Sequence, residues 1–302
     1  MTPRTAPPSG SLDERPAWQL LGLAAGVVVW TLAVVVLVVT VASITAPLSP
    51  LGGRAHTAAV GLPVVLALYE SVRRLLGLPA AWFRADRPSR RLAVWLPVGL
   101  AFPTVVLGGQ LWLLDAASLG PPPALAAAGK VLAAALAAGL LAGVLEELAL
   151  RGALLRLLEV RWGPRAAIAG SAAVFALLHQ GHAGSPGALA AVLASMGAAG
   201  LLLGVVAVRS GSVWPAVWLH AGWNTVFGGG VVAAAPPGRP LEAALLQFRL
   251  PTESLLTGGT ASLAAAPLTT AALLLATLAA ARVPRRWLAR DPNREPGARA
   301  VR

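Results

Sequence analysis

The sequence predicts an all-α protein, a polytopic membrane helix bundle of about eight transmembrane helices with both termini in the cytoplasm. Hydrophobic residues make up 57% of the 302 residues and charged residues only 12%. The mean hydropathy is +0.72. Apolar runs near the length of a membrane span recur along the chain, and a helix satisfies all its own backbone groups in lipid. No alternating pattern typical of strands competes with these runs.

Each predicted helix corresponds to one apolar run. Seven runs are long enough to span a bilayer: 18–45, 57–76, 92–114, 124–148, 188–208, 212–234 and 261–281. A shorter run at 166–180 is taken as an eighth helix, either thinned or re-entrant. The segments 1–17 and 284–302 are rich in proline and arginine, and we expect both to be disordered tails. Residues 18–283 are therefore predicted to form one membrane domain.

Arginine residues are concentrated in alternate loops. They cluster at 73–91, 151–165 and 282–290, with Arg209 between the sixth and seventh helices. With eight spans, these loops all fall on one side, which the positive-inside rule assigns to the cytoplasm. Loops near 120, 184 and 245 are then expected on the other side. The net charge of +12 is thereby explained by topology and anionic lipid, so the bilayer is the expected partner and no nucleic acid is expected.

Composition also narrows the source and the chemistry. High alanine, arginine and glycine content with a single lysine is typical of a high-GC bacterium, so we expect a multi-pass protein of the inner (cytoplasmic) membrane. The absence of cysteine excludes disulfides, thiol catalysis and cysteine metal sites. Three GxxxG patterns, at 22–26, 139–143 and 200–204, permit close helix contacts but are weak evidence in a chain so rich in glycine.

A few polar side chains interrupt the apolar runs, where such groups are costly and typical of function. They are Glu146, Glu147, Arg151, His179, His220 and Asn224. Glu147 and Arg151 are four residues apart and share a helix face, which predicts an ion pair. Glu146 points about 100° away from Glu147, so the two acids need not share a role. His56 and His182 are interpreted as loop residues.

This set of residues suits a buried hydrolytic site. A carboxylate can accept a proton from water, a histidine can orient that water, and a second histidine with an amide can stabilise an oxyanion. Alternatively, Glu146, His179 and His220 could ligate zinc, although the HExxH signature is absent. The residues alone leave both arrangements open. The plainer interpretation of Glu147 and Arg151 is a structural ion pair at a helix end.

Three motifs in order resemble the CPBP intramembrane proteases, relatives of the CAAX prenyl endopeptidase Rce1 and of bacterial Abi proteins. They are "EELALR" at 146–151, "FALLH" at 175–179 and "HAGWN" at 220–224, within a core of 124–232. The resemblance implies an endopeptidase in which Glu146 and His179 activate water and His220 and Asn224 form an oxyanion hole. It further implies that Glu147 assists them and that Arg151 is the structural partner of Glu147. No cofactor is required by that mechanism, although zinc is possible.

The implied substrate is a membrane-associated peptide or protein, which we do not expect to be prenylated in a bacterium. Two other functions remain open: a proton-coupled transporter, which also uses buried Glu and His, and a catalytically idle immunity or scaffold protein on the same fold. Simple threading raises one difficulty. It puts Glu146 near the cytoplasmic end of its helix and His179 near the far end of the next, so a shared site requires the chain at 148–165 to fold back.

Overall fold

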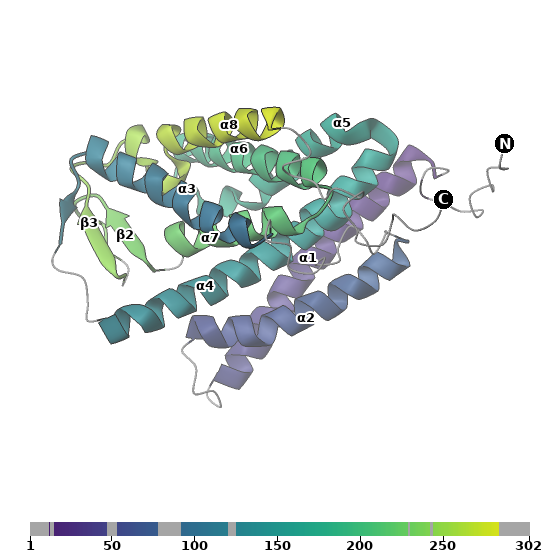
Figure 1. Ribbon diagram of the computed structural model, residues 1–302, viewed down its shortest axis with the longest axis horizontal. Coiled ribbons are helices and arrows are strands. Elements are labelled where there is room, and N and C mark those ends of the chain that lie inside the picture. The colour runs from purple at the N-terminus through teal and green to yellow at the C-terminus, as the bar shows by residue number, and fades with distance from the viewer. Residues whose placement is uncertain are drawn as a thin grey trace, which may run out of the picture.

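The computed structural model describes residues 12, 15–46, 53–77, 92–119, 125–228, 230–241 and 244–283. The two predicted tails lie almost wholly outside these residues. The described chain forms a bundle of helices with a small sheet at one end (Figure 1). The predicted all-α membrane bundle is therefore confirmed in its main features.

The helices follow the predicted apolar runs closely in the first half of the chain. Their bounds are α1 (Ala17–Thr45), α2 (Gly53–Leu75), α3 (Leu92–Leu113), α4 (Leu125–Glu147), α5 (Leu155–Leu178), α6 (Pro186–Ser210), α7 (Trp214–Phe227) and α8 (Pro267–Arg282). A π-helical segment, Leu148–Leu154, joins α4 to α5 without interruption. Short 3₁₀ turns lie at Gln180–His182, Leu255–Thr257 and Leu263–Ala265.

The predicted number of eight spanning helices is not confirmed. Among the described residues, five helices are long and apolar enough to cross a membrane: Ala17–Thr45, Gly53–Leu75, Val94–Leu113, Ala128–Leu178 and Pro186–Ser210. Helix α7 has 14 residues and α8 has 16. At about 1.5 Å per residue, both are shorter than the hydrocarbon core of about 30 Å. The side of the membrane on which each end lies stays a prediction.

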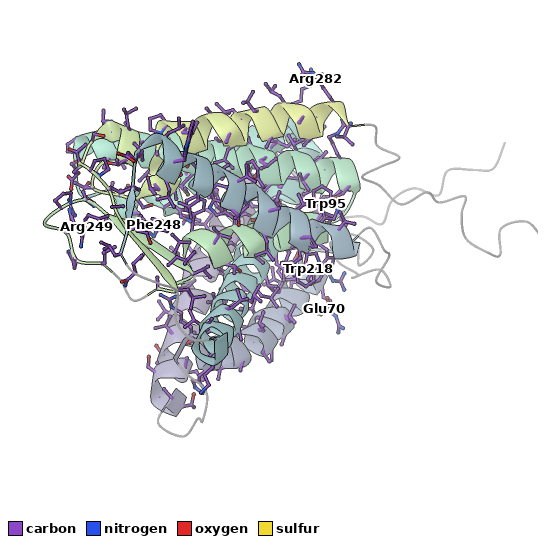
Figure 2. All side chains as sticks on the ribbon, turned by 60° about the vertical axis from the view of Figure 1, so that its left-hand side comes forward. Glu70, Trp95, Trp218, Phe248, Arg249 and Arg282 are labelled. Carbon is purple, nitrogen blue, oxygen red and sulfur yellow. The ribbon has the colours of Figure 1, made fainter. Side chains whose placement is uncertain are left out.

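The sequence analysis expected no strands, and that expectation is wrong. Strands β1 (Ala117–Ser118), β2 (Val232–Ala235) and β3 (Leu246–Arg249) form a three-stranded sheet in the order β1-β3-β2. Strand β3 pairs antiparallel with β1 and parallel with β2. The run at 212–234, interpreted as one helix, therefore ends its helix at Phe227 and enters a strand. Figure 2 shows Phe248 and Arg249 of the sheet at the opposite end of the molecule from Glu70, Trp95 and Trp218.

The chain reverses within α5, at Gly163. This residue has φ 74° and ψ 171°, a conformation that essentially only glycine adopts, and Pro164 follows it. The segments before and after Gly163 lie side by side. The Cβ position of Gly170 lies 2.9 Å from Leu158, and further from the turn His179 lies beside Glu146. Residues 146–163 and 164–179 each cover roughly 25 Å of helix, so they return the chain to its starting depth. This fold-back removes the difficulty that simple threading raised.

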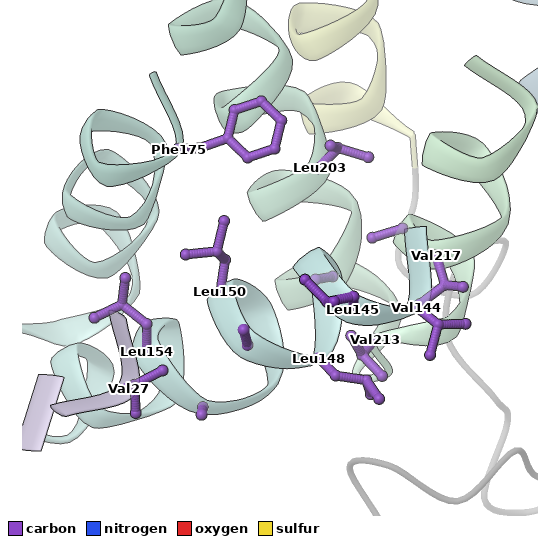
Figure 3. Close-up of a cluster of buried hydrophobic side chains, with 14 of the residues drawn as sticks. Val27, Val144, Leu145, Leu148, Leu150, Leu154, Phe175, Leu203, Val213 and Val217 are labelled. Atoms are coloured by element: carbon purple, nitrogen blue, oxygen red, sulfur yellow. The ribbon is translucent and has the colours of Figure 1, made fainter. Parts of the chain in front are cut away.

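The π-helical segment between α4 and α5 lies at the centre of the core. All seven of its residues are buried. Figure 3 shows Leu150 and Leu154 in this segment, with Val27 of α1 beside Leu154 and Phe175 of α5 above Leu150. A π-helical turn is wider than an α-helical one and is frequent at functional sites. Here the segment begins directly after the two glutamates and carries Arg151.

Glycines let α7 approach its neighbours at backbone distance. A Cβ added at Gly222 would lie 2.3 Å from the carbonyl carbon of Gly99 in α3. One added at Gly139 would lie 2.5 Å from Ala221 O, and one at Gly143 would lie 2.9 Å from Val217 O. The GxxxG pattern at 139–143 thus makes a specific contact between α4 and α7.

The two other GxxxG patterns differ from each other. Gly200 and Gly204 of α6 pack against Ala172 and Ile168 of α5, so the pattern at 200–204 also makes a specific contact. Among the residues that the structure describes, nothing lies within 4 Å of a Cβ added at Gly22 or Gly26. Small residues at close helix contacts are typical of membrane bundles, and two of the three patterns serve that purpose here.

Candidate active site

A cavity of ≈ 700 Å³ lies among α4, α5, α6 and α7. Four of the residues singled out in the sequence line it: Glu146, His179, His220 and Asn224. Glu147 and Arg151 do not line it. Both side chains are 0% exposed and lie behind the cavity wall. The two adjacent glutamates therefore occupy different environments, as their angular separation on the helix predicts.

Glu146 and His179 face each other across the cavity wall. Glu146 Oε2 lies 3.8 Å from His179 Nε2, and the side chains are about a quarter exposed. His179 Nδ1 lies 2.8 Å from the carbonyl oxygen of Phe175. A carbonyl can only accept, so Nδ1 carries the hydrogen and the neutral ring presents an unprotonated Nε2 to Glu146. Glu146 Oε2 is buried and has no hydrogen-bond partner among the described residues.

Glu147 connects α4 to α7. Its Oε1 accepts from Arg151 Nη1 at 2.7 Å, and the same oxygen lies 2.8 Å from His220 Nδ1. The predicted ion pair with Arg151 is therefore present. The contact with His220 is an addition that spacing alone could not reveal. Because a carboxylate only accepts, this contact keeps a hydrogen on Nδ1 of His220 and leaves Nε2 as the nitrogen available to a bound molecule.

Phe175 lies between the other side chains of the site. Its ring centroid is 4.5 Å from that of His179 and 5.7 Å from that of His220. The Arg151 guanidinium also lies over the Phe175 ring, 4.8 Å from its centroid. Arg151 also donates to the backbone oxygen of Gly200 at 3.1 Å. Phe175, the first residue of "FALLH", thus packs both histidines against the buried ion pair.

Asn224 lies one helical turn after His220, and both line the cavity. No hydrogen bond joins its side-chain amide to another residue of the described ranges, so the amide is available to a bound molecule. His182, interpreted from sequence as a loop residue, also lines the cavity. Its ring stacks on that of His179 at 5.5 Å. The spacing of three residues between the two histidines was the only signal in the sequence that could have pointed to it.

A short segment before α8 closes one side of the cavity, and the sequence analysis missed it. Ala261, Ser262, Ala264 and Ala265 line the cavity. Ser195 of α6 donates to the Ala264 oxygen at 2.6 Å. A second bond comes from α3, where buried Gln110 donates to the oxygen of Leu263 at 3.1 Å. Residues of such low complexity carry no local signal, because their position depends on these distant polar contacts.

The zinc arrangement does not fit the side chains as the structure places them. In the described part of the chain, no three His, Asp or Glu residues are grouped so that they could hold a metal ion. His220 Nδ1 lies 2.8 Å from Glu147 Oε1, which leaves only Nε2 of this ring for a metal.

The comparisons with known proteins agree with the motifs. Residues 128–226 match the family described as type II CAAX prenyl endopeptidase Rce1-like. Over this segment the chain is similar to the CPBP family of CAAX-type proteases. The segment contains all six polar residues singled out above and covers about a third of the 302 residues. No curated protein and no solved structure matches the chain.

The five helices that are long and apolar enough to cross a membrane, among the described residues, support a multi-pass membrane protein. Its central segment is similar to a protease family. Helices α1–α3, the sheet and α8 lie outside the matched segment.

Proposed function

We propose that this CPBP protein is an intramembrane endopeptidase that hydrolyses a peptide bond of a membrane-associated protein or peptide. The observation that carries the proposal is the placement of Glu146 Oε2 and His179 Nε2, 3.8 Å apart, on the wall of the cavity. That separation is too long for a hydrogen bond. A water that contacts both groups at about 2.8 Å requires the Glu146 carboxylate to turn toward the cavity, because Oε2 is buried in this arrangement.

Glu146 and His179 would act together on that water. Both present acceptor atoms, so each can receive one hydrogen bond from the same water molecule. Glu146 would take the proton as the water oxygen attacks the carbonyl carbon of the substrate, and it would later pass the proton to the leaving amine. The backbone bond from His179 Nδ1 to Phe175 fixes the ring so that Nε2 stays directed at the water.

His220 and Asn224 would stabilise the oxyanion that forms. An oxyanion hole needs donors, and the Asn224 amide supplies one. Because Nδ1 directs its hydrogen to Glu147, His220 can donate from Nε2 only as the doubly protonated cation, which the adjacent Glu147 carboxylate would stabilise. Glu147 is thus proposed as a positioning residue rather than the base, in line with its complete burial. Arg151 would hold Glu147 in place.

The two other functions make different use of the same residues. A proton-coupled transporter would use Glu146 and His179 as a relay and would cleave nothing. A catalytically idle scaffold would need none of the cavity residues for its role. The cavity with an available carboxylate, imidazole and amide favours hydrolysis over both.

The test is cleavage of a panel of membrane-tethered peptides by the purified full-length protein. Glu146→Gln keeps size and hydrogen bonding but removes the base, so turnover should fall by orders of magnitude with an unchanged melting temperature. His179→Ala should be similarly severe. Asn224→Ala should lower kcat by about 10²–10³, the effect of losing one oxyanion donor.

The neighbouring glutamate provides the matched control. Glu147→Gln should lower both thermal stability and turnover, because it leaves Arg151 without its partner in the core. If Glu146→Gln cleaves at the wild-type rate while Glu147→Gln is inactive but stable, the roles of the two acids are reversed. Normal cleavage by every variant would rule out this site.

A further inference from the structure

Strand β2 has one edge that pairs with β3 and one with which no described residue pairs. In its parallel ladder with β3, Leu246 N donates to Val231 O at 2.9 Å and Leu250 N donates to Ala235 O at 3.0 Å. Alternate residues of a strand point their backbone groups to opposite sides. The N–H and C=O groups of Val232 and Ala234 therefore point away from β3, and no described residue pairs with them.

This free edge lacks the features that usually protect one. Edge strands are commonly blocked by charged side chains, proline or a bulge, because their unpaired groups can accept another strand. Strand β2 reads Val-Ala-Ala-Ala, which has neither charge nor proline; its first three residues are partly buried and Ala235 is buried. The edge is thus chemically able to pair with an extended peptide.

A second cavity of ≈ 370 Å³ runs along this edge. It is lined by all four consecutive residues of β2, whereas no residue of β3 between Leu246 and Arg249 lines it. Successive side chains of a strand point to opposite faces of a sheet. A cavity that touches every residue of β2 and none between Leu246 and Arg249 reaches the edge that faces away from β3, and it extends onto the core cluster against which Val232 and Ala234 pack.

The second cavity meets the candidate active site. Phe227, Ala261 and Ser262 line both cavities. The helix rise from His220 to Phe227 is about 10 Å, which an extended peptide covers in about three residues. A chain lying along β2 would therefore reach the Glu146–His179 pair after a few more residues.

We infer that the free edge of β2 is the docking strand for substrate: an extended peptide segment adds to it and continues past Phe227 into the cavity at Glu146. Strand addition of this kind supplies affinity through main-chain hydrogen bonds and tolerates varied side chains. The inference rests on the proposed function, because it describes how that same site takes up its substrate. The expected substrate therefore has an extended, non-helical segment that lies several residues from the peptide bond that is cut.

Substitution of Ala234 tests the docking strand without touching the catalytic residues. Ala234→Pro removes an N–H that points away from β3, so the β2–β3 ladder survives, and the proline ring blocks the edge. Ala234→Val is the matched control, because it adds volume but keeps the N–H. Binding is measured as the anisotropy of a fluorescent peptide, with each variant made in the Glu146→Gln protein. The peptide is the one that wild type cleaves fastest or, if none is cleaved, the one that binds most tightly. We expect Ala234→Pro to weaken binding about tenfold and Ala234→Val to leave it near the parent value.

Backbone methylation of the same peptide gives a second, independent reading. Single N-methyl groups placed at successive positions should weaken binding at every second residue over the docked segment, because only alternate N–H groups face β2. Equal effects at all positions, or normal binding by Ala234→Pro, would overturn the inference while cleavage by wild type upholds the proposed function. Loss of dimers in Ala234→Pro with unchanged peptide binding would show that a second copy occupies the edge, which also overturns it. Alternating effects without any cleavage would support the docking strand and refute the protease.

Discussion

Removal of the Arg151 side chain should destabilise the protein strongly. Arg151 and Glu147 are both 0% exposed, and their atoms approach to 2.7 Å. Arg151→Ala leaves the Glu147 carboxylate in the core without its cation, and breaking such a pair costs about 3–5 kcal/mol. At roughly 2–4 °C per kcal/mol, the melting temperature in detergent should fall by about 6–20 °C. Turnover should fall as well, because Glu147 also holds His220.

A neighbouring ion pair supplies the control. Arg156 lies 2.8 Å from Glu159, but these side chains are 34% and 20% exposed. Because a partly exposed pair of this kind contributes about 0–1 kcal/mol, Arg156→Ala should change the melting temperature by only a few degrees. The double variant Glu147→Gln/Arg151→Met should be more stable than either single variant, since it leaves no lone charge in the core. An Arg151→Ala protein with normal stability and no turnover would refute this reasoning and place Arg151 among the catalytic groups.

Two further predictions concern the fold. Reporter fusions near residues 122, 184 and 245 should report the non-cytoplasmic side, because the arginine-rich loops are predicted to lie on the cytoplasmic side. A cytoplasmic signal at 122 would contradict the predicted topology. Gly163→Ala should cost about 1–3 kcal/mol and lower turnover, since its φ of 74° is strained for alanine and the turn returns His179 to Glu146. Gly108→Ala, where a Cβ meets no described atom within 4 Å, should be neutral or slightly stabilising, and equal melting curves for the two would argue against a strained turn at Gly163.

Hydropathy predicted the membrane helix bundle, and motif order predicted four of the residues that line its cavity: Glu146, His179, His220 and Asn224. Long apolar runs gave α1 to α4 and α6 within a few residues of their observed ends, because such runs are constrained by the bilayer itself. The spacing of Glu147 and Arg151 gave their ion pair, because it depends only on helix periodicity. These are local properties, which a single sequence records directly.

The remaining features depend on contacts between distant parts of the chain. The bond between His220 and Glu147 joins α7 to α4, and no spacing along the sequence encodes it. Strand β2 escaped detection because Val-Ala-Ala-Ala is as apolar as the helices beside it, and β1 and β3, with two and four residues, are too short to show an alternating pattern. The turn at Gly163 could have been suspected from "WGPR", where glycine and proline adjoin, yet the apolar runs on either side gave no indication of direction.

The close backbone contacts that glycines permit around α7 limit which substitutions this protein tolerates. Gly222 touches α3, and Gly139 and Gly143 touch α4, so the rotation and height of α7 are set by the absence of side chains. A methyl group at any of the three would displace the helix that carries His220 and Asn224 while altering no reacting atom. In a saturation scan of activity, substitutions at these glycines should therefore be as damaging as substitutions at the residues proposed to be catalytic. The intolerant positions should follow the two contact lines of α7, one with α3 and one with α4. Homologous proteins with altered substrate selectivity would be expected to vary the residues of the cavity walls and to keep these three glycines.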